Sequence, residues 1–173
     1  MLTMRRLLGG MLAVLLVSGV AGAQTTTAPQ EKQRAADPPA AEVEAFIANY
    51  VKLWNAEDAQ AITTKIYRFD APGNPMQTVD GFQKAYAILK AQGYDHSDVH
   101  SIHACILNPE TALAENRFAR VKKDGSPIAP GTDNMAAIYL LRKTADGWRI
   151  GSMINMDAGA KFDCKSSSGA IQQ

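Results

Sequence analysis

The chain has 173 residues, 46% of them hydrophobic, and a formal net charge of +1 at pH 7. This length and this hydrophobic content are typical of one domain with a packed core. No block of like charges occurs in the sequence, which excludes the basic surface that non-specific nucleic-acid binding requires.

The first 23 residues have the layout of a secretory signal peptide. Arg5 and Arg6 precede an apolar run over residues 7–20, and Ala21-Gly22-Ala23 then forms a small-residue cleavage site. The apolar run is shorter than the roughly 20 residues that a membrane-spanning helix needs, which disfavours a membrane anchor. We therefore expect cleavage before Gln24 and a periplasmic or secreted mature chain without a membrane attachment.

A helical pattern follows a predicted flexible linker over residues 24–40, which is rich in Thr, Ala, Pro and Gln. Asp58 is expected to cap a second helix over residues 59–66, with Ile62 and Ile66 on its inner side. The first helix is predicted from residue 41 to the turn at residues 55–58. Its apolar stripe consists of Val43, Phe46, Ile47, Tyr50, Val51 and Trp54.

The next segment is predicted to hold a short hairpin and a third helix. Residues 67–70 and 76–79 are two candidate strands around a turn that contains Pro and Gly. Asp80 is expected to cap a helix over residues 81–92, and Gly93 is expected to end it.

From residue 99 onward the sequence has the alternation of β-strands. Three helices followed by such strands predict an α+β domain, in which the helices cover one face of a curved, mostly antiparallel sheet. The predicted strands span residues 99–107, 111–121, 135–142 and 148–155, and residues 159–173 are predicted to be a disordered tail.

Three stretches of this domain carry a family resemblance. They are Tyr-Val-Lys-Leu-Trp-Asn-Ala-Glu-Asp at residues 50–58, Thr-Val-Asp-Gly-Phe at residues 78–82, and the predicted hairpin at residues 139–150. Together they resemble the nuclear transport factor 2-like superfamily, which includes SnoaL-like proteins and ketosteroid isomerases. The resemblance implies a domain over residues 41–158 whose three helices pack in a cone against a strongly curved sheet of about four to six strands. It also implies an apolar pocket at the open end, and a homodimer formed through the sheet.

Aromatic and amide side chains on otherwise apolar elements are the candidates for a binding site. Tyr50 is the strongest of them, because it lies on the buried stripe of the first helix with a hydroxyl that needs a hydrogen-bond partner. The alternative is a core tyrosine whose hydroxyl is satisfied by the backbone or by water. The predicted ligand-binding residues are Tyr50, Trp54, Tyr67, Asn74, Tyr86, Asn116, Tyr139 and Asn155.

Acid–base candidates are fewer. The resemblance places the donor tyrosine of the isomerases on Tyr50 and their carboxylate base on Asn74, and an amide is no base at neutral pH. Asp70 is the nearest carboxylate, and His100 and His103 are alternatives because imidazole titrates near neutral pH. These two histidines are three residues apart on a predicted strand and therefore point to opposite faces, which disfavours a metal site.

The two cysteines that follow the predicted signal peptide, Cys105 and Cys164, leave two interpretations open. An oxidising compartment permits a disulfide between them. Alternatively, Cys105 packs as a small hydrophobic residue within its apolar strand.

The leading hypothesis is an exported pocket protein that binds a small apolar or amphipathic ligand as a homodimer, without a cofactor. The first alternative is a cofactor-free isomerase, cyclase or hydratase that uses acid–base residues in the cone. The second is a non-catalytic dimeric interaction module whose interior is filled by side chains. The fold alone does not choose among them.

Overall fold

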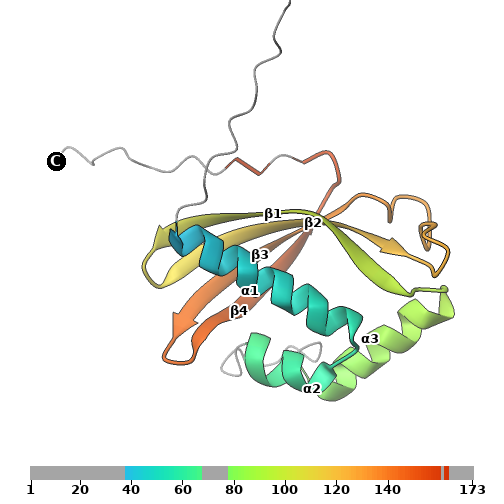
Figure 1. Cartoon of the computed structure of the whole chain (residues 1–173), viewed down its shortest axis with the longest axis horizontal. Helices are drawn as coiled ribbons and strands as arrows, with labels where there is room; N and C mark the ends of the chain where they lie inside the picture. Colours follow the sequence, from blue (N-terminus) through green and yellow to red (C-terminus); the bar gives the residue numbers. More distant parts are fainter. Residues whose placement is uncertain (1–37, 68–77, 161, 164–173) are drawn as a thin grey trace, which may run out of the picture. The chain divides into compact units, whose positions relative to one another are not determined.

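Helix α1 (Pro38–Asn55) lies along one face of a β-sheet, which we call the inner face (Figure 1). The computed structural model describes residues 38–67, 78–160, 162 and 163, and all of them belong to one compact unit. The predicted signal peptide, most of the predicted linker and the predicted hairpin around residues 68–77 lie outside the described residues. No helix within the described ranges is both long and apolar enough to cross a membrane.

The predicted apolar stripe of α1 packs against the sheet. Four of its residues are buried and the other two, Phe46 and Trp54, are half-buried. The helix ends at Asn55, and Glu57 then adopts a positive φ of 55° in the turn. The buried members of the stripe are Val43, Ile47, Tyr50 and Val51.

The second helical segment differs in detail from its prediction. It begins as α2 (Ala59–Ala61) and continues as a wider π-turn, η1 (Ile62–Ile66). Asp58 caps it as expected, since its carboxylate accepts a hydrogen bond from the Ala61 N–H at 2.9 Å. Thr63 donates its hydroxyl proton to the Ala59 carbonyl at 2.7 Å, a bond of the kind that bends helices. Ile62 and Ile66 are buried, as predicted.

Helix α3 (Val79–Ala91) corrects two predictions at its start. Its N-cap is Thr78 and not Asp80, because the Thr78 hydroxyl accepts the hydrogen bond from the Gly81 N–H at 3.0 Å. Val79 therefore belongs to the helix and not to a returning strand. Gly93 ends the helix as expected and adopts a φ of +84°, a conformation that glycine adopts without strain.

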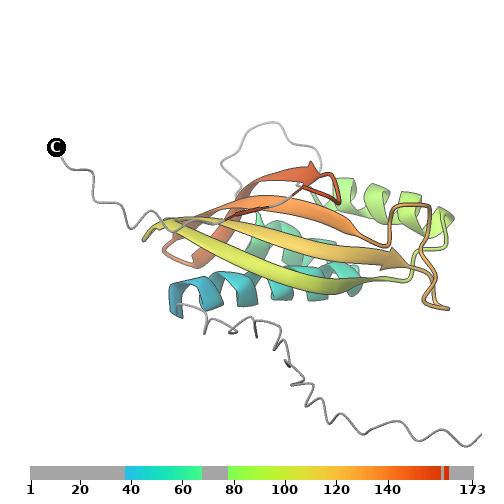
Figure 2. The same cartoon turned by 90° about the horizontal axis from the view of Figure 1, so that it is seen from above.

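Four antiparallel strands form the sheet in the order β1-β2-β3-β4. They are β1 (His96–Asn108), β2 (Thr111–Val121), β3 (Met135–Thr144) and β4 (Gly147–Met156). Figures 1 and 2 show the three helices on one face of the curved sheet. The α+β fold with helices over one face of an antiparallel sheet is thus confirmed.

Asn55 fastens the end of α1 to the start of β1, which explains its place in the 50–58 motif. Its amide donates to the Ser97 carbonyl and its side-chain oxygen accepts from the Ser97 N–H, both at 2.9 Å. The Tyr94 hydroxyl donates to the same oxygen at 3.1 Å. These three hydrogen bonds tie the end of α1 to the start of β1, next to Ser97 in the strand.

The outer face of β2 is covered by residues that follow β4. Arg117 donates to the carbonyl oxygens of Ala158, at 2.8 Å, and of Ala160. Cys105, on the neighbouring strand β1, is buried and disulfide-bonded. Cys164, the other cysteine of the sequence, lies outside the described residues.

Candidate functional site

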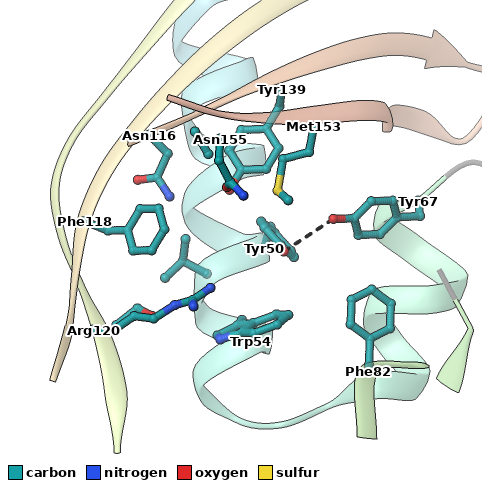
Figure 3. A pocket seen from close by; sticks show the side chains of 13 residues that line it. Tyr50, Trp54, Tyr67, Phe82, Asn116, Phe118, Arg120, Tyr139, Met153 and Asn155 are labelled. Atoms are coloured by element: carbon teal, nitrogen blue, oxygen red, sulfur yellow. Dashed lines mark hydrogen bonds between the residues drawn. The ribbon is translucent and has the colours of Figure 1, made fainter. Parts of the chain in front are cut away.

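A cavity of about 280 Å³ lies between the helices and the inner face of the sheet. Figure 3 shows side chains from α1, α3 and the sheet around it. The helical side supplies Tyr50, Val51, Trp54, Tyr67 and Phe82, and the sheet supplies Ser97, Asn116, Phe118, Arg120, Ala137, Tyr139, Met153 and Asn155.

Aromatic rings make most of the helical wall, with Tyr50 at its centre. The Tyr50 ring makes edge contacts with the rings of Trp54, Tyr67 and Tyr139, at centroid distances of 6.3, 6.0 and 5.7 Å. Phe82 extends this wall through contacts with Trp54 at 6.1 Å and Tyr67 at 5.6 Å. Such a wall offers flat apolar surface and the edges of aromatic rings to a ligand.

The tyrosine hydroxyls in the wall stay protonated at neutral pH. Tyr67 donates a long hydrogen bond of 3.4 Å to the hydroxyl oxygen of Tyr50. Burial raises the pKa of Tyr50, well above its ordinary value, and also the pKa of Tyr67. Burial likewise raises the pKa of Tyr139, against the opposing hydrogen bond from Asn116 and the charge of Arg120. These phenols can donate hydrogen bonds but are poor bases.

Strand β2 contributes the polar side of the cavity. Asn116, Phe118 and Arg120 alternate along the strand and so share its inner face. Asn116 is only 1% exposed, yet its Oδ1 has no hydrogen-bond partner among the described residues. The Nε of Arg120 is likewise buried without a partner in the described part of the chain. The cavity wall therefore carries an unsatisfied acceptor and an unsatisfied, charged donor.

The rim lies on β4. Met153 lines the cavity and is 44% exposed, and Asn155 lines it two residues further along the strand and is also exposed. Ser97, on the β1 side, is buried and its hydroxyl is already bonded to the Tyr94 hydroxyl at 2.9 Å. Met153 and Asn155 are therefore the two exposed side chains of the described cavity wall.

The structure brings six of the predicted ligand-binding residues together around this cavity. Tyr86 is not among them: it is buried behind Trp54, at a ring distance of 4.9 Å, and does not line the cavity. Asn74 lies outside the described residues. The six are Tyr50, Trp54, Tyr67, Asn116, Tyr139 and Asn155.

None of the predicted acid–base residues belongs to the described wall of the cavity. His100 and His103 are exposed on β1, and neither lines the cavity. The hypothesis that one of them enters the pocket is therefore corrected. His103 lies opposite Glu115 in the register of β1 and β2, on the outer side of the sheet, and His100 lies at an irregularity in the pairing of these strands. Asp70 lies outside the described residues. Within those residues, no group of three or more His, Cys, Asp or Glu side chains is placed to hold a metal ion.

Sequence reasoning missed Arg120, which is the only charged residue in the described wall of the cavity. A signal for it was available, because Arg120 follows Asn116 and Phe118 at a spacing of two along one predicted strand. The spacing alone does not indicate whether this face or the opposite face, which carries Glu115 and Arg117, lies toward the helices. The other missed wall residues are Val51, Phe82, Ser97, Phe118, Ala137 and Met153.

Comparison with solved structures supports the fold. An NTF2-like protein with a cystatin-like fold from Novosphingobium aromaticivorans is 20% identical, with a TM-score of 0.50 over 66% of this chain and 79% of that chain. A domain of unknown function with a cystatin-like fold from Nostoc punctiforme is 15% identical, with a TM-score of 0.50 over 68% of this chain and 75% of that one. Aln2 from a Streptomyces species is 12% identical, with a TM-score of 0.50 over 68% of this chain and 88% of that one. These identities are too low to transfer a function.

Comparison with curated proteins gives no match. Comparison with protein families gives a match over residues 41–158, the same span that the resemblance implies for the domain. This span contains every described residue of the cavity wall. The chain therefore belongs to the family described as NTF2-like protein (DUF6841).

Proposed function

We propose that this protein binds a small, largely apolar molecule in the cavity between its helices and its sheet. The observation that carries the proposal is an unfilled space of about 280 Å³ whose helical wall is aromatic. Ligand pockets typically occupy about 300–1,000 Å³ and combine an apolar wall with a few placed polar groups. The volume lies just below that range and therefore favours a small ligand, of about one or two rings.

Binding is favoured over acid–base catalysis by the chemistry of the wall. Among the described residues, no carboxylate and no imidazole lines the cavity. The phenols of Tyr50, Tyr67 and Tyr139 have pKa values that burial raises above their ordinary value. A general base near neutral pH would have to come from elsewhere. The hypothesis of an interaction module with a filled interior is disfavoured by the cavity itself.

A neutral two-ring probe tests the proposal. We expect 2-naphthaleneacetamide to bind the purified chain and to release heat in isothermal titration calorimetry. Met153→Trp, at the rim, should narrow the entrance and weaken binding about tenfold or more, since poor fit in a small pocket costs more than about 1.4 kcal/mol. The matched control is Ile154→Trp on the same strand, which is 65% exposed and does not line the cavity. It should change the affinity by less than about twofold.

Two results would reject the proposal. One is the absence of binding to the unmodified chain. The other is an equal effect of the two tryptophan substitutions, because it would place the probe on the surface of β4 and not in the cavity.

We also propose that the chain is exported and acts as a homodimer. Export is supported by the arginines, apolar run and small-residue site of residues 1–23, and dimerisation by the family resemblance alone. Native mass spectrometry of protein made in an exporting host tests both. We expect a dimer whose subunits begin at Gln24; a retained N-terminus would reject export, and a monomer would reject dimerisation.

A further inference from the structure

The cavity wall carries a cation, Arg120, that has no counter-ion among the described residues, and this feature specifies the ligand further. We infer that the ligand is an aromatic or alicyclic carboxylate, whose anionic group binds Arg120 while its ring packs against the aromatic wall. This inference rests on the proposed binding function and adds the chemical class of the ligand.

The backbone around Arg120 is held in place. Its N–H donates to the Thr132 carbonyl at 2.7 Å, and its own carbonyl accepts from the Ile128 N–H at 3.1 Å. The side chain starts from the inner face of β2 and, in Figure 3, runs from the strand toward Trp54. The guanidinium is therefore directed into the cavity by a fixed strand and not by a loose loop.

The guanidinium has no polar partner in the described part of the protein. No ion pair or side-chain hydrogen bond joins Arg120 to another described residue, and its Nε is buried and unpaired. Its aromatic contact is weak, with the guanidinium carbon 5.9 Å from the centre of the Phe118 ring. Arg117, three residues earlier, has by contrast a carboxylate at 2.8 Å and two carbonyl oxygens.

An unpaired charge in such a place is costly. Arg120 is half-buried, and a cation that loses part of its hydration raises the free energy of the folded state unless an anion or several acceptors replace the water. A carboxylate matches the planar fork of arginine with two parallel hydrogen bonds. A neutral ligand would fill the same space and leave the charge unpaired.

Asn116 adds a second polar position on the same face of β2, and Phe118 lies between it and Arg120 (Figure 3). It is almost completely buried, and its Oδ1 is an acceptor without a partner among the described residues. A hydroxyl or N–H group on the ring of the ligand, away from its carboxylate, would satisfy this atom. The aromatic wall formed by Tyr50, Trp54 and Phe82 requires an apolar body, so that a bare inorganic anion would satisfy only half of the site.

The test compares two ligands of the same shape that differ in charge. 2-Naphthaleneacetate and 2-naphthaleneacetamide are titrated calorimetrically into the unmodified chain, and acetate serves as the anion without the rings. We expect the carboxylate to bind about tenfold or more tightly than the amide. Hydrogen bonds to charged groups are stronger than neutral ones by a free energy that corresponds to about this factor in affinity. Acetate alone should give no measurable binding.

Arg120→Gln should remove the preference for the carboxylate over the amide. Arg142→Gln is the matched control, because Arg142 is exposed, donates to Thr111 and does not line the cavity. The Arg142→Gln variant should keep the preference for the carboxylate over the amide. Circular dichroism melting identifies a variant that does not fold, and Arg120→Lys, which keeps the charge, should then retain part of the preference.

The outcomes separate this inference from the proposed function. If the amide binds but the carboxylate binds no better, or if Arg120→Gln and Arg142→Gln alter the preference equally, the inference is overturned and the binding function stands. If neither compound binds the unmodified chain, both are overturned. If acetate binds as tightly as the naphthalene compound, the site is an anion site and the ring-containing ligand is overturned.

Discussion

The two faces of strand β2 carry similar polar residues that the structure treats in opposite ways. On the outer face, Glu115 and Arg117 form an ion pair at 2.8 Å, and Arg117 also donates to two carbonyl oxygens. On the inner face, Asn116 and Arg120 keep atoms that have no partner among the described residues. The outer arginine thus has an ionic partner, whereas the inner arginine has none among the described residues. A buried polar group without a partner in a native protein calls for an explanation, such as a bound water, ion or ligand.

The two faces also differ in how charge is balanced. The outer pair consists of two charged groups that contact each other without hydrogen-bond geometry at Glu115 Oε1, so its energy is mainly ionic. On the inner face, Arg120 shares the cavity wall with phenols that burial keeps neutral. Among the described residues, an anion is therefore missing from the inner face and present on the outer one.

Alkaline pH should have the largest effect on the stability of the folded protein. Burial raises the pKa of all five tyrosines, Tyr50, Tyr67, Tyr86, Tyr94 and Tyr139, above the ordinary value of 10.0. Above that pH the unfolded chain loses protons that the folded chain keeps, so the stability present below it falls as the pH rises. Each tyrosine contributes about 1.4 kcal/mol per pH unit between its unfolded and folded pKa values.

Tyrosinate absorbance measures this effect. The signal should stay low in the folded protein and appear together with the loss of the circular dichroism signal. Ionisation of two or more tyrosines near their ordinary pKa in a protein that remains folded would show that the inner face is wetter than the structure implies.

Removal of the outer carboxylate should have the next largest effect. Glu115 is 4% exposed, and Glu115→Ala leaves Arg117 without its ionic partner. We expect the free energy of unfolding in urea to fall by about 3 kcal/mol, the low end for a broken buried pair, because the Arg117 side chain is 22% exposed. Glu110→Ala, at an exposed turn, is the control and should cost less than about 0.5 kcal/mol. A cost below about 1 kcal/mol for Glu115→Ala would show that the outer pair contributes little.

The same substitution on both faces sharpens the comparison. Arg120→Met removes a partly buried cation that has no ionic partner among the described residues, and we expect the free energy of unfolding to stay constant or to rise by about 1 kcal/mol. Arg117→Met removes a paired cation and should lower the free energy of unfolding by about 2–3 kcal/mol. Equal losses for the two variants in urea unfolding would mean that Arg120 already has a partner in the folded protein.

Tyr50→Phe should give the smallest effect on stability. The hydrogen bond from Tyr67 to Tyr50 is long, at 3.4 Å, so its loss should cost less than about 1 kcal/mol. The affinity for 2-naphthaleneacetate should fall about three- to tenfold if the Tyr50 hydroxyl contacts the ligand. Tyr86→Phe is the matched control, because Tyr86 is buried outside the cavity wall and its hydroxyl has no hydrogen-bond partner among the described residues. An unchanged affinity for Tyr50→Phe would remove Tyr50 from the binding site.

Much of the fold was predictable because local patterns report it. The spacing of apolar residues in α1 indicated its buried side, and Asp58 and Gly93 marked helix ends through their own chemistry. Alternation and turn residues located all four strands. The cap of α3 was misassigned because Thr78 and Asp80 are both good capping residues, and the choice between them depends on backbone conformation.

The sequence by itself determined the helices, the strands and the aromatic candidates for the cavity, since periodicity and capping are local properties of the chain. Only the tertiary structure decided which face of β2 meets the helices. A strand has two faces with the same spacing, and both faces here carry an arginine. The packing of α1 against the sheet places Arg120 inside and Arg117 outside. The absence of a partner for Arg120 among the described residues is likewise a property of the assembled fold, because ion pairs depend on distances between segments far apart in the sequence.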